Sequence, residues 1–212
     1  MNLNKISDKN INNFYINVMN CQENCALENS CVIHNPKSGH FPRAFYFDAK
    51  KPMKILVIGA NPAKGKGTGK EFKILQENAF NHQKLLEIQK EIVWDMFESN
   101  KHVFQRYLNK ALKILLFDDE NSPEHILDYI YYSNLVKCST DPDFGKLTEK
   151  VKRQIVSKCY HQCLKKELEL LKPQLILVYS ADAFKILHSI TTIKVVSLPR
   201  IGRTNLLSSE FV

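Results

Sequence analysis

The sequence lacks long apolar runs, and this absence excludes some classes of protein at the outset. No window of about eighteen consecutive apolar residues occurs in the 212 residues, so no transmembrane helix is predicted. The first residues, MNLNKISDKN, do not contain the apolar segment of a secretory signal peptide. We therefore expect a cytoplasmic protein with no membrane partner.

Glycine is also scarce, and the seven glycines form neither of two common nucleotide-binding motifs. No glycine is followed by four residues and then Gly-Lys-Ser or Gly-Lys-Thr, which excludes a P-loop. Gly65, Gly67 and Gly69 alternate with other residues, so the GxGxxG pattern is absent as well. The sequence thus argues against a nucleotide-binding protein of the P-loop class.

Acidic residues are fewer than basic ones. Thirty Lys and Arg residues against 22 Asp and Glu residues give a formal charge of +8. This balance favours a polyanionic partner such as nucleic acid, although many proteins without such a partner carry a similar charge. The length suits one α/β domain over residues 1–212, and no obligate protein partner is evident.

The stretch around residues 53–72 organises the chain. Residues 55–58, ILVI, form an apolar run of strand length, which is typical of a parallel strand buried on both faces. Ligands of parallel α/β sheets bind beyond the carboxyl ends of the strands. The glycines that follow would let backbone amides approach an anion or a base. A lysine-rich surface turn is the alternative, and this stretch alone does not decide between the two.

Helical spacing of apolar residues predicts helices over 9–19, over 71–116 with a break near residues 99–100, and over 149–171. The last of these begins after Thr148 as its cap and ends before Pro173. Ser122-Pro123-Glu124 also resembles a helix start, and a further helix is expected over 181–188. Additional strands are predicted over the following ranges: 129–138, 175–179 and 194–199, with 45–47 as an edge strand and 139–148 as a polar loop.

Six cysteines in a reducing compartment are interpreted as buried thiols or metal ligands rather than as disulfides. Cys21, Cys25 and Cys31 lie in a polar stretch, where a metal site and free thiols are both open interpretations. Cys159 and Cys163 are one helical turn apart and share a face. They are either small core residues or neighbours at one site.

Three segments, together with the N-terminal cysteines, resemble the uracil-DNA glycosylase superfamily in the same order along the chain. They are GANPAKGKGTGKEF at 59–72, YYSNLVKC at 131–138 and CYHQCLKKELELLKPQLILVYSADAF at 159–184. The resemblance is strongest to the iron-sulfur families 4 and 5 and to the related mismatch-specific enzymes. It implies a three-layer αβα fold with a central four-stranded parallel sheet.

The resemblance also implies roles for residues of these motifs. Asn61 would position the catalytic water, Phe72 would stack on the extruded base, and Asn134 would read the base edge. Further residues would line the base pocket: Gly59, Ala60, Pro62 and Ala63. We expect basic residues of the glycine loop and of the C-terminal segment to contact DNA phosphates: Lys64, Lys66, Lys70 and Arg203.

A 4Fe-4S cluster is a further implication of the resemblance, since cysteines from three segments are available as ligands. The implied ligands are Cys21, Cys25, Cys138 and Cys159. Spacings that differ by one residue from the family pattern leave Cys31 and Cys163 as alternative ligands.

The sequence departs from the family in two places. The last family motif carries a His-Pro pair that supports the leaving base, whereas the segment at 197–205 is SLPRIGRTN. Arg200 is the candidate to replace that histidine as a fixed cation, and Arg203 is another. The stretch between Phe72 and Asn134 is longer than in compact members, which predicts a helical insertion at about 73–120.

These expectations together favour a monofunctional DNA glycosylase that removes a flipped-out uracil or another altered pyrimidine, as in base-excision DNA repair. A glycosylase that removes a bulky modified cytosine from phage DNA, in defence against phage, is the alternative within that class. A catalytically silent iron-sulfur protein that binds nucleic acid is the alternative from another class.

Overall fold

The computed structural model describes residues 8–21, 32–33, 42–43, 54–62, 70–79, 81–98, 103–118 and 121–198. Its centre is a four-stranded sheet in the order β3-β2-β5-β6, with every neighbouring pair parallel. The strands are β2 (Ile55–Gly59), β3 (Ile130–Asn134), β5 (Leu175–Val178) and β6 (Lys194–Ser197). All residues of β2 and β3 are buried, as expected for central parallel strands. The predicted sheet is confirmed.

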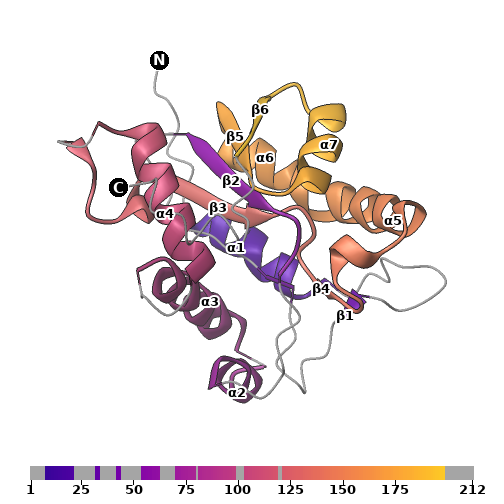
Figure 1. Cartoon of the computed structure of the whole chain (residues 1–212). Coiled ribbons are helices and arrows are strands. Elements are labelled where there is room, and N and C mark those ends of the chain that lie inside the picture. The colour runs from indigo at the N-terminus through magenta and orange to yellow at the C-terminus, as the bar shows by residue number, and fades with distance from the viewer. Residues whose placement is uncertain are drawn as a thin grey trace.

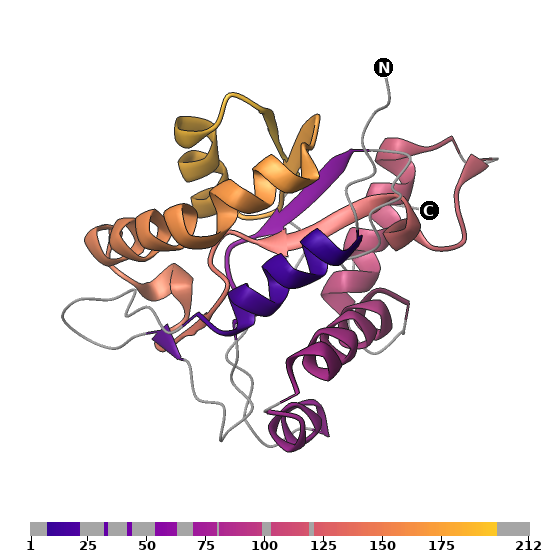
Figure 2. The same cartoon turned by 180° about the vertical axis from the view of Figure 1, so that it is seen from behind.

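Helices cover both faces of the sheet, which gives three layers (Figure 1). Successive side chains of a strand point to opposite faces, so Leu56 and Ile58 join one core cluster and Ile55 and Val57 join another. The first cluster is packed by α1 (Asp8–Met19), α5 (Glu149–Cys159), α6 (Lys165–Leu171) and α7 (Ala181–Ile190). The second cluster is packed by α3 (His82–Glu98) and α4 (Val103–Leu116). From behind, α1, α5 and α6 lie in front of the strands (Figure 2).

The stretch predicted to be helical over 71–116 forms α2 (Lys70–Glu77), α3 and α4. The predicted helix over 9–19 is also confirmed. The helix start predicted at Ser122 is wrong, because only a 3-10 turn, Ile126–Asp128, precedes β3. Too few residues lie between Pro123 and Ile130 for a longer helix. The edge strand predicted at 45–47 lies outside the described residues.

The second predicted strand, 129–138, is too long. It ends at Asn134. The amide of Leu135 makes the last ladder bond, to the carbonyl oxygen of Gly59 at 2.8 Å, and the next amide, that of Val136, donates to Ala60 at 2.9 Å and so breaks the alternation of a parallel ladder. The chain then forms β4 (Ser139–Thr140), which pairs antiparallel with β1 (Val32–Ile33). The start of the loop predicted at 139–148 is therefore a strand.

The helix predicted over 149–171 begins and ends where expected but is interrupted. Thr148 caps α5 by accepting a hydrogen bond from the amide of Val151 at 3.4 Å. Lys172 adopts a left-handed conformation, with φ 47°, before Pro173. Between α5 and α6 lies a π-helical turn, Tyr160–Leu164. Such turns are frequent at functional sites.

Among the described residues, no helix has the length and apolar character needed to cross a lipid bilayer.

Candidate active site at the carboxyl edge of the sheet

The carboxyl ends of β2 and β3 bring two predicted site residues together. Gly59 and Asn134 are register partners at the last position of the two parallel strands. The hydrogen bonds from Leu135 and Val136 to Gly59 and Ala60 then fasten the two following loops to each other. The segment that carries Asn61 is thus held at a fixed position relative to Asn134. This edge is where parallel sheets bind ligands.

Asn134 is the best-defined polar group of this edge. Only 3% of the residue is exposed, and its Oδ1 lies 2.6 Å from the position that a Cβ atom on Gly59 would take. Buried amides need hydrogen-bond partners, and at the carboxyl edge of a parallel sheet a ligand with a polar edge can supply them. Asn134 is therefore a candidate ligand-binding residue.

Asn61 lies on the loop directly after β2 and is held by a residue from another element. Its Nδ2 donates to Oγ1 of Thr140 at 3.2 Å, and Thr140 is the second residue of β4. This hydrogen bond leaves the Oδ1 of Asn61 as an acceptor for a ligand or a water molecule. Thr140 was not predicted from the sequence, because nothing in a two-residue strand marks it as a partner of Asn61.

Gly59 lies beneath two polar side chains. A Cβ atom at this position would lie 2.6 Å from Oδ1 of Asn134 and would overlap the hydroxyl of Tyr179. Tyr179 follows β5, the strand on the other side of β2. Three adjacent strands therefore contribute to one small region, and only glycine leaves room for it.

Tyr179 is paired with Tyr132 of β3. The two hydroxyls are 2.6 Å apart, and the rings are parallel with centroids 6.3 Å apart. Phe97 of α3 packs edge-on against Tyr132 at 5.0 Å. Burial raises the pKa of Tyr132 to about 12 and raises the pKa of Tyr179 well above its usual value, so both hydroxyls are neutral near pH 7. Sequence reasoning treated both tyrosines as ordinary strand residues.

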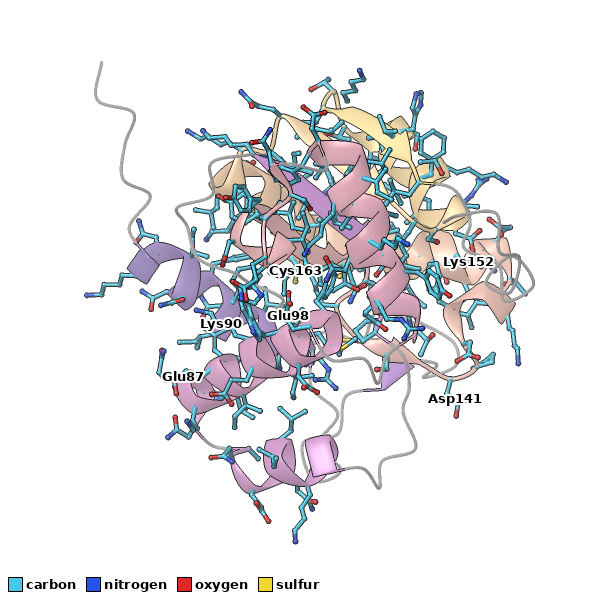
Figure 3. The ribbon with its side chains drawn as sticks, turned by 60° about the vertical axis from the view of Figure 1, so that its left-hand side comes forward. Glu87, Lys90, Glu98, Asp141, Lys152 and Cys163 are labelled. Atoms are coloured by element: carbon cyan, nitrogen blue, oxygen red, sulfur yellow. The ribbon has the colours of Figure 1, made fainter. Side chains whose placement is uncertain are left out.

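Cysteines gather on the opposite face of the sheet, where the π-helical turn follows α5. The thiol of Cys163 makes hydrogen bonds with Cys159 and with Cys21, which follows α1. The amide of Lys137 donates to Sγ of Cys159 at 3.4 Å, so the buried Cys138 is the neighbour of a residue in contact with the group. Figure 3 shows Cys163 in the interior of the molecule.

The cysteine contacts perturb the two thiols in opposite directions. Hydrogen bonding to Cys163 lowers the pKa of Cys159, with a further contribution from Lys137, whereas burial opposes this shift. Hydrogen bonds to Cys159 and to Cys21, together with burial, raise the pKa of Cys163. The four described cysteines form no disulfide. Within the described residues, no group of three His, Cys, Asp or Glu side chains is arranged to hold a metal ion.

The other predicted site residues are placed only in part. Pro62 is buried next to Asn61. Lys70 and Phe72 lie in the first turn of α2, but their side chains are not described. The remaining predicted residues lie outside the described residues: Cys25, Cys31, Ala63, Lys64, Lys66, Arg200 and Arg203.

A parallel three-layer sheet with two asparagines at its carboxyl edge is typical of α/β proteins that bind their ligands at this edge. The chain belongs to the uracil DNA glycosylase superfamily, whose family model matches residues 46–209. A comparison with curated proteins finds no match. The matched span contains the sheet and both asparagines. Membership in this superfamily supports a DNA glycosylase-like function and DNA as the partner.

Proposed function

We propose that the protein is a monofunctional DNA glycosylase that hydrolyses the N-glycosidic bond of a uracil or another altered pyrimidine flipped out of DNA. The observation that carries this proposal is the buried amide of Asn134, which lies at the strand end paired with Gly59 and beside the segment that carries Asn61. A pyrimidine edge offers the donors and acceptors that such an amide needs.

The reaction requires water at C1′ of the sugar and a stabilised leaving base. The bond between C1′ and the base nitrogen breaks, and its electron pair stays on the base. The water oxygen forms the new bond to C1′, and the proton that the water loses is transferred to solvent or to the departing base. The Oδ1 of Asn61, oriented by Thr140, would hold this water. An amide is a weak base, so stabilisation of the departing base carries much of the rate.

The remaining predicted residues complete this proposal. Asn134 would hydrogen-bond the base, and Phe72 would stack on it, which contributes about 1 to 3 kcal/mol. Arg200 would stabilise the departing base in place of the family histidine. Lysines of the glycine loop would bind phosphates, in keeping with the net charge of +8, and help offset the few kcal/mol that base flipping costs.

We further propose that the cysteines hold a 4Fe-4S cluster. Support comes from the contacts of Cys21, Cys163 and Cys159, because thiolates are the ligands of such clusters. Cys138 and Cys25 complete the set of candidates, with Cys31 as the alternative in the N-terminal segment. A cluster here would fix the end of α1 to the π-helical turn. Anaerobically prepared protein should contain about four iron atoms and four sulfides per chain. Colourless, iron-free protein would overturn the proposed cluster but not the proposed glycosylase activity.

The test of activity is alkali-labile strand breakage in a panel of DNAs that contain uracil, hypoxanthine, hydroxymethylcytosine or glucosylated cytosine. We expect breakage with at least one altered pyrimidine. Asn61→Ala should abolish it while DNA affinity, and its decrease with salt, stay unchanged. Asn78→Ala is the matched control, since Asn78 follows α2 and its Nδ2 donates to the carbonyl oxygen of Ile74 of that helix, in an exposed hydrogen bond.

A second candidate, removal of a bulky modified cytosine, is favoured by one observation. The segment SLPRIGRTN at 197–205 lacks the family's histidine, so the electrostatic stabilisation of a departing uracil anion would differ from that in the family. Breakage confined to the glucosylated or hydroxymethylated members of the panel would select this candidate. Salt-dependent DNA binding without breakage in any member would instead indicate a silent binding protein.

A further inference from the structure

We propose that Tyr179, held in place by Tyr132, is a specificity-determining residue that contacts the same base as Asn134. The inference rests on the proposed function, because it assumes that Asn134 meets a flipped base. It adds a second base-recognition group, directly after β5, to which the resemblance assigns no role.

The side chains of Tyr179 and Asn134 reach the same place in the structure. Its hydroxyl and the Oδ1 of Asn134 both reach the point directly above Gly59, where a Cβ atom would otherwise be. The two side chains come from opposite sides of β2, one after β5 and one from β3. A planar ligand that reaches Asn134 at this edge therefore also meets the hydroxyl of Tyr179.

Tyr132 holds the side chain of Tyr179 in place. The hydroxyl of Tyr132 lies 2.6 Å from its own hydroxyl, and the two rings are parallel to within 1°. Tyr132 is itself only 4% exposed and packs against Phe97. The Tyr179 side chain is thus fixed by a buried neighbour, whereas Tyr179 itself is only partly buried. A rigidly held side chain discriminates between similar ligands better than a mobile one does.

A fixed hydroxyl beside the amide of Asn134 would make base recognition more specific. One amide cannot by itself distinguish a uracil-like edge from a cytosine-like edge, because its donor and acceptor ends can exchange by rotation. A second hydroxyl at a fixed place restricts which edge atoms can be satisfied together. The phenol ring also occupies the space above Gly59, so it limits the size of the base that fits. The ligand class is a pyrimidine with a polar edge and a substituent that fits beside the ring.

The experiment measures base recognition separately from turnover. The probe is a duplex that carries 2′-fluoro-2′-deoxyuridine, whose glycosidic bond resists cleavage, with the unmodified duplex as reference. Matched 2′-fluoro pyrimidine duplexes with the other panel bases complete the set. We expect wild-type protein to prefer one altered duplex over the reference. Tyr179→Phe should reduce that preference about ten- to a hundredfold without changing the affinity for unmodified DNA.

Two further variants sharpen the test. Tyr132→Phe keeps the Tyr179 hydroxyl but removes the hydroxyl that lies 2.6 Å from it, so we expect a smaller loss of the same preference. Tyr160→Phe is the matched control, because the Tyr160 hydroxyl contacts the Ile190 carbonyl oxygen away from this edge, at 3.4 Å. It should behave as wild type.

The outcomes separate this inference from the proposed function. A preference without strand breakage, lost in Tyr179→Phe, would support the role of Tyr179 while overturning the proposed hydrolysis. Breakage and preference that both survive in Tyr179→Phe would overturn the role of Tyr179 and leave the hydrolysis standing. Wild-type protein that neither prefers nor breaks any altered duplex would overturn both.

Discussion

Gly59 has no side chain because its neighbours occupy that space. The oxygen of Asn134 and the ring of Tyr179 both lie 2.6 Å from the position of a Cβ atom. Gly59→Ala should push these two side chains aside and reduce base excision by about a hundredfold, which is the usual effect of a displacement near 1 Å at a reacting centre. Single-turnover rates measure this. Gly145→Ala is the matched control, since no atom lies within 4 Å of a Cβ there. Equal single-turnover rates for Gly59→Ala and Gly145→Ala would contradict the expectation that a Cβ atom at Gly59 displaces its neighbours.

Thr140 orients the side chain of Asn61. Its Oγ1 is the only partner that the described residues offer to the amide of Asn61. Thr140→Val keeps the branched shape that suits a strand but removes this acceptor, so Asn61 loses its orientation. We expect kcat to fall about tenfold with KM little changed, whereas Thr140→Ser should retain the wild-type rate. A rise in KM at constant kcat would show that Thr140 serves binding instead.

The elements themselves were mostly predictable from local patterns. The run at 55–58, the Thr148 cap and Pro173 each act within a few residues, so the sequence predicts the strand and the ends of the helix. The end of β3 was missed because Leu135 and Val136 continue the apolar pattern, although the amide of Val136 already bonds to Ala60, after β2, outside the ladder. The π-helical turn was missed because one extra residue per turn leaves the apolar spacing nearly intact.

The site was predictable only where a motif marks it. Asn61 and Asn134 stand at strand ends within recognisable motifs, and the structure brings their two loops together. Tyr132 and Tyr179 are 47 residues apart, and their contact depends on strand order, which apolar spacing does not specify. The pairing of β1 with β4 is equally hidden, because two-residue strands have no periodicity.

His125 connects the end of α3 to the segment before β3. Its Nδ1 lies 3.0 Å from Oε2 of Glu98, the last residue of α3, and its ring packs on Trp94 at 4.9 Å. Hydrogen bonding to Glu98 raises the pKa of His125 above 6.5, although burial opposes this. The protonated form therefore stabilises the fold fully below pH 6.5, and the stabilisation is lost as the pH rises through the folded-state pKa.

This loss of stabilisation with rising pH predicts how the stability of the His125→Gln variant compares with that of wild type. The variant should have a lower urea midpoint than wild type at pH 5.5, and the difference should shrink by pH 9. Glu98→Gln should remove most of that pH dependence in the wild-type background, because it removes the charge that raises the pKa. A difference that stays constant from pH 5.5 to pH 9 would show that His125 contributes through packing on Trp94 alone.

The whole molecule is connected beneath the site by a buried polar network. Glu167 of α6 accepts hydrogen bonds from Tyr15 of α1 at 2.6 Å and from Ser133 of β3 at 2.8 Å. Lys137, after β3, pairs with the other oxygen of Glu167 at 2.5 Å, and its amide contacts Cys159. Because Ser133 precedes Asn134, the network links the cysteine face of the sheet to the strand that carries the candidate base-reading residue.

The final prediction follows from the burial of this network. Glu167 and Lys137 are at most 1% exposed, so removing one charge leaves the other without compensation in the interior. Glu167→Gln should lower the free energy of unfolding by about 3 to 5 kcal/mol. Glu169→Gln, the same change at an exposed position of the same helix, should alter it by less than about 0.5 kcal/mol.

A double variant, Lys137→Met with Glu167→Leu, separates the cost of a lone charge from the value of the pair. It should recover much of the stability lost in Glu167→Gln, because no unpaired charge remains. Urea denaturation of the three variants measures this. If the double variant is stable but loses activity, the network sets the position of Asn134; if it keeps activity, the network serves folding alone.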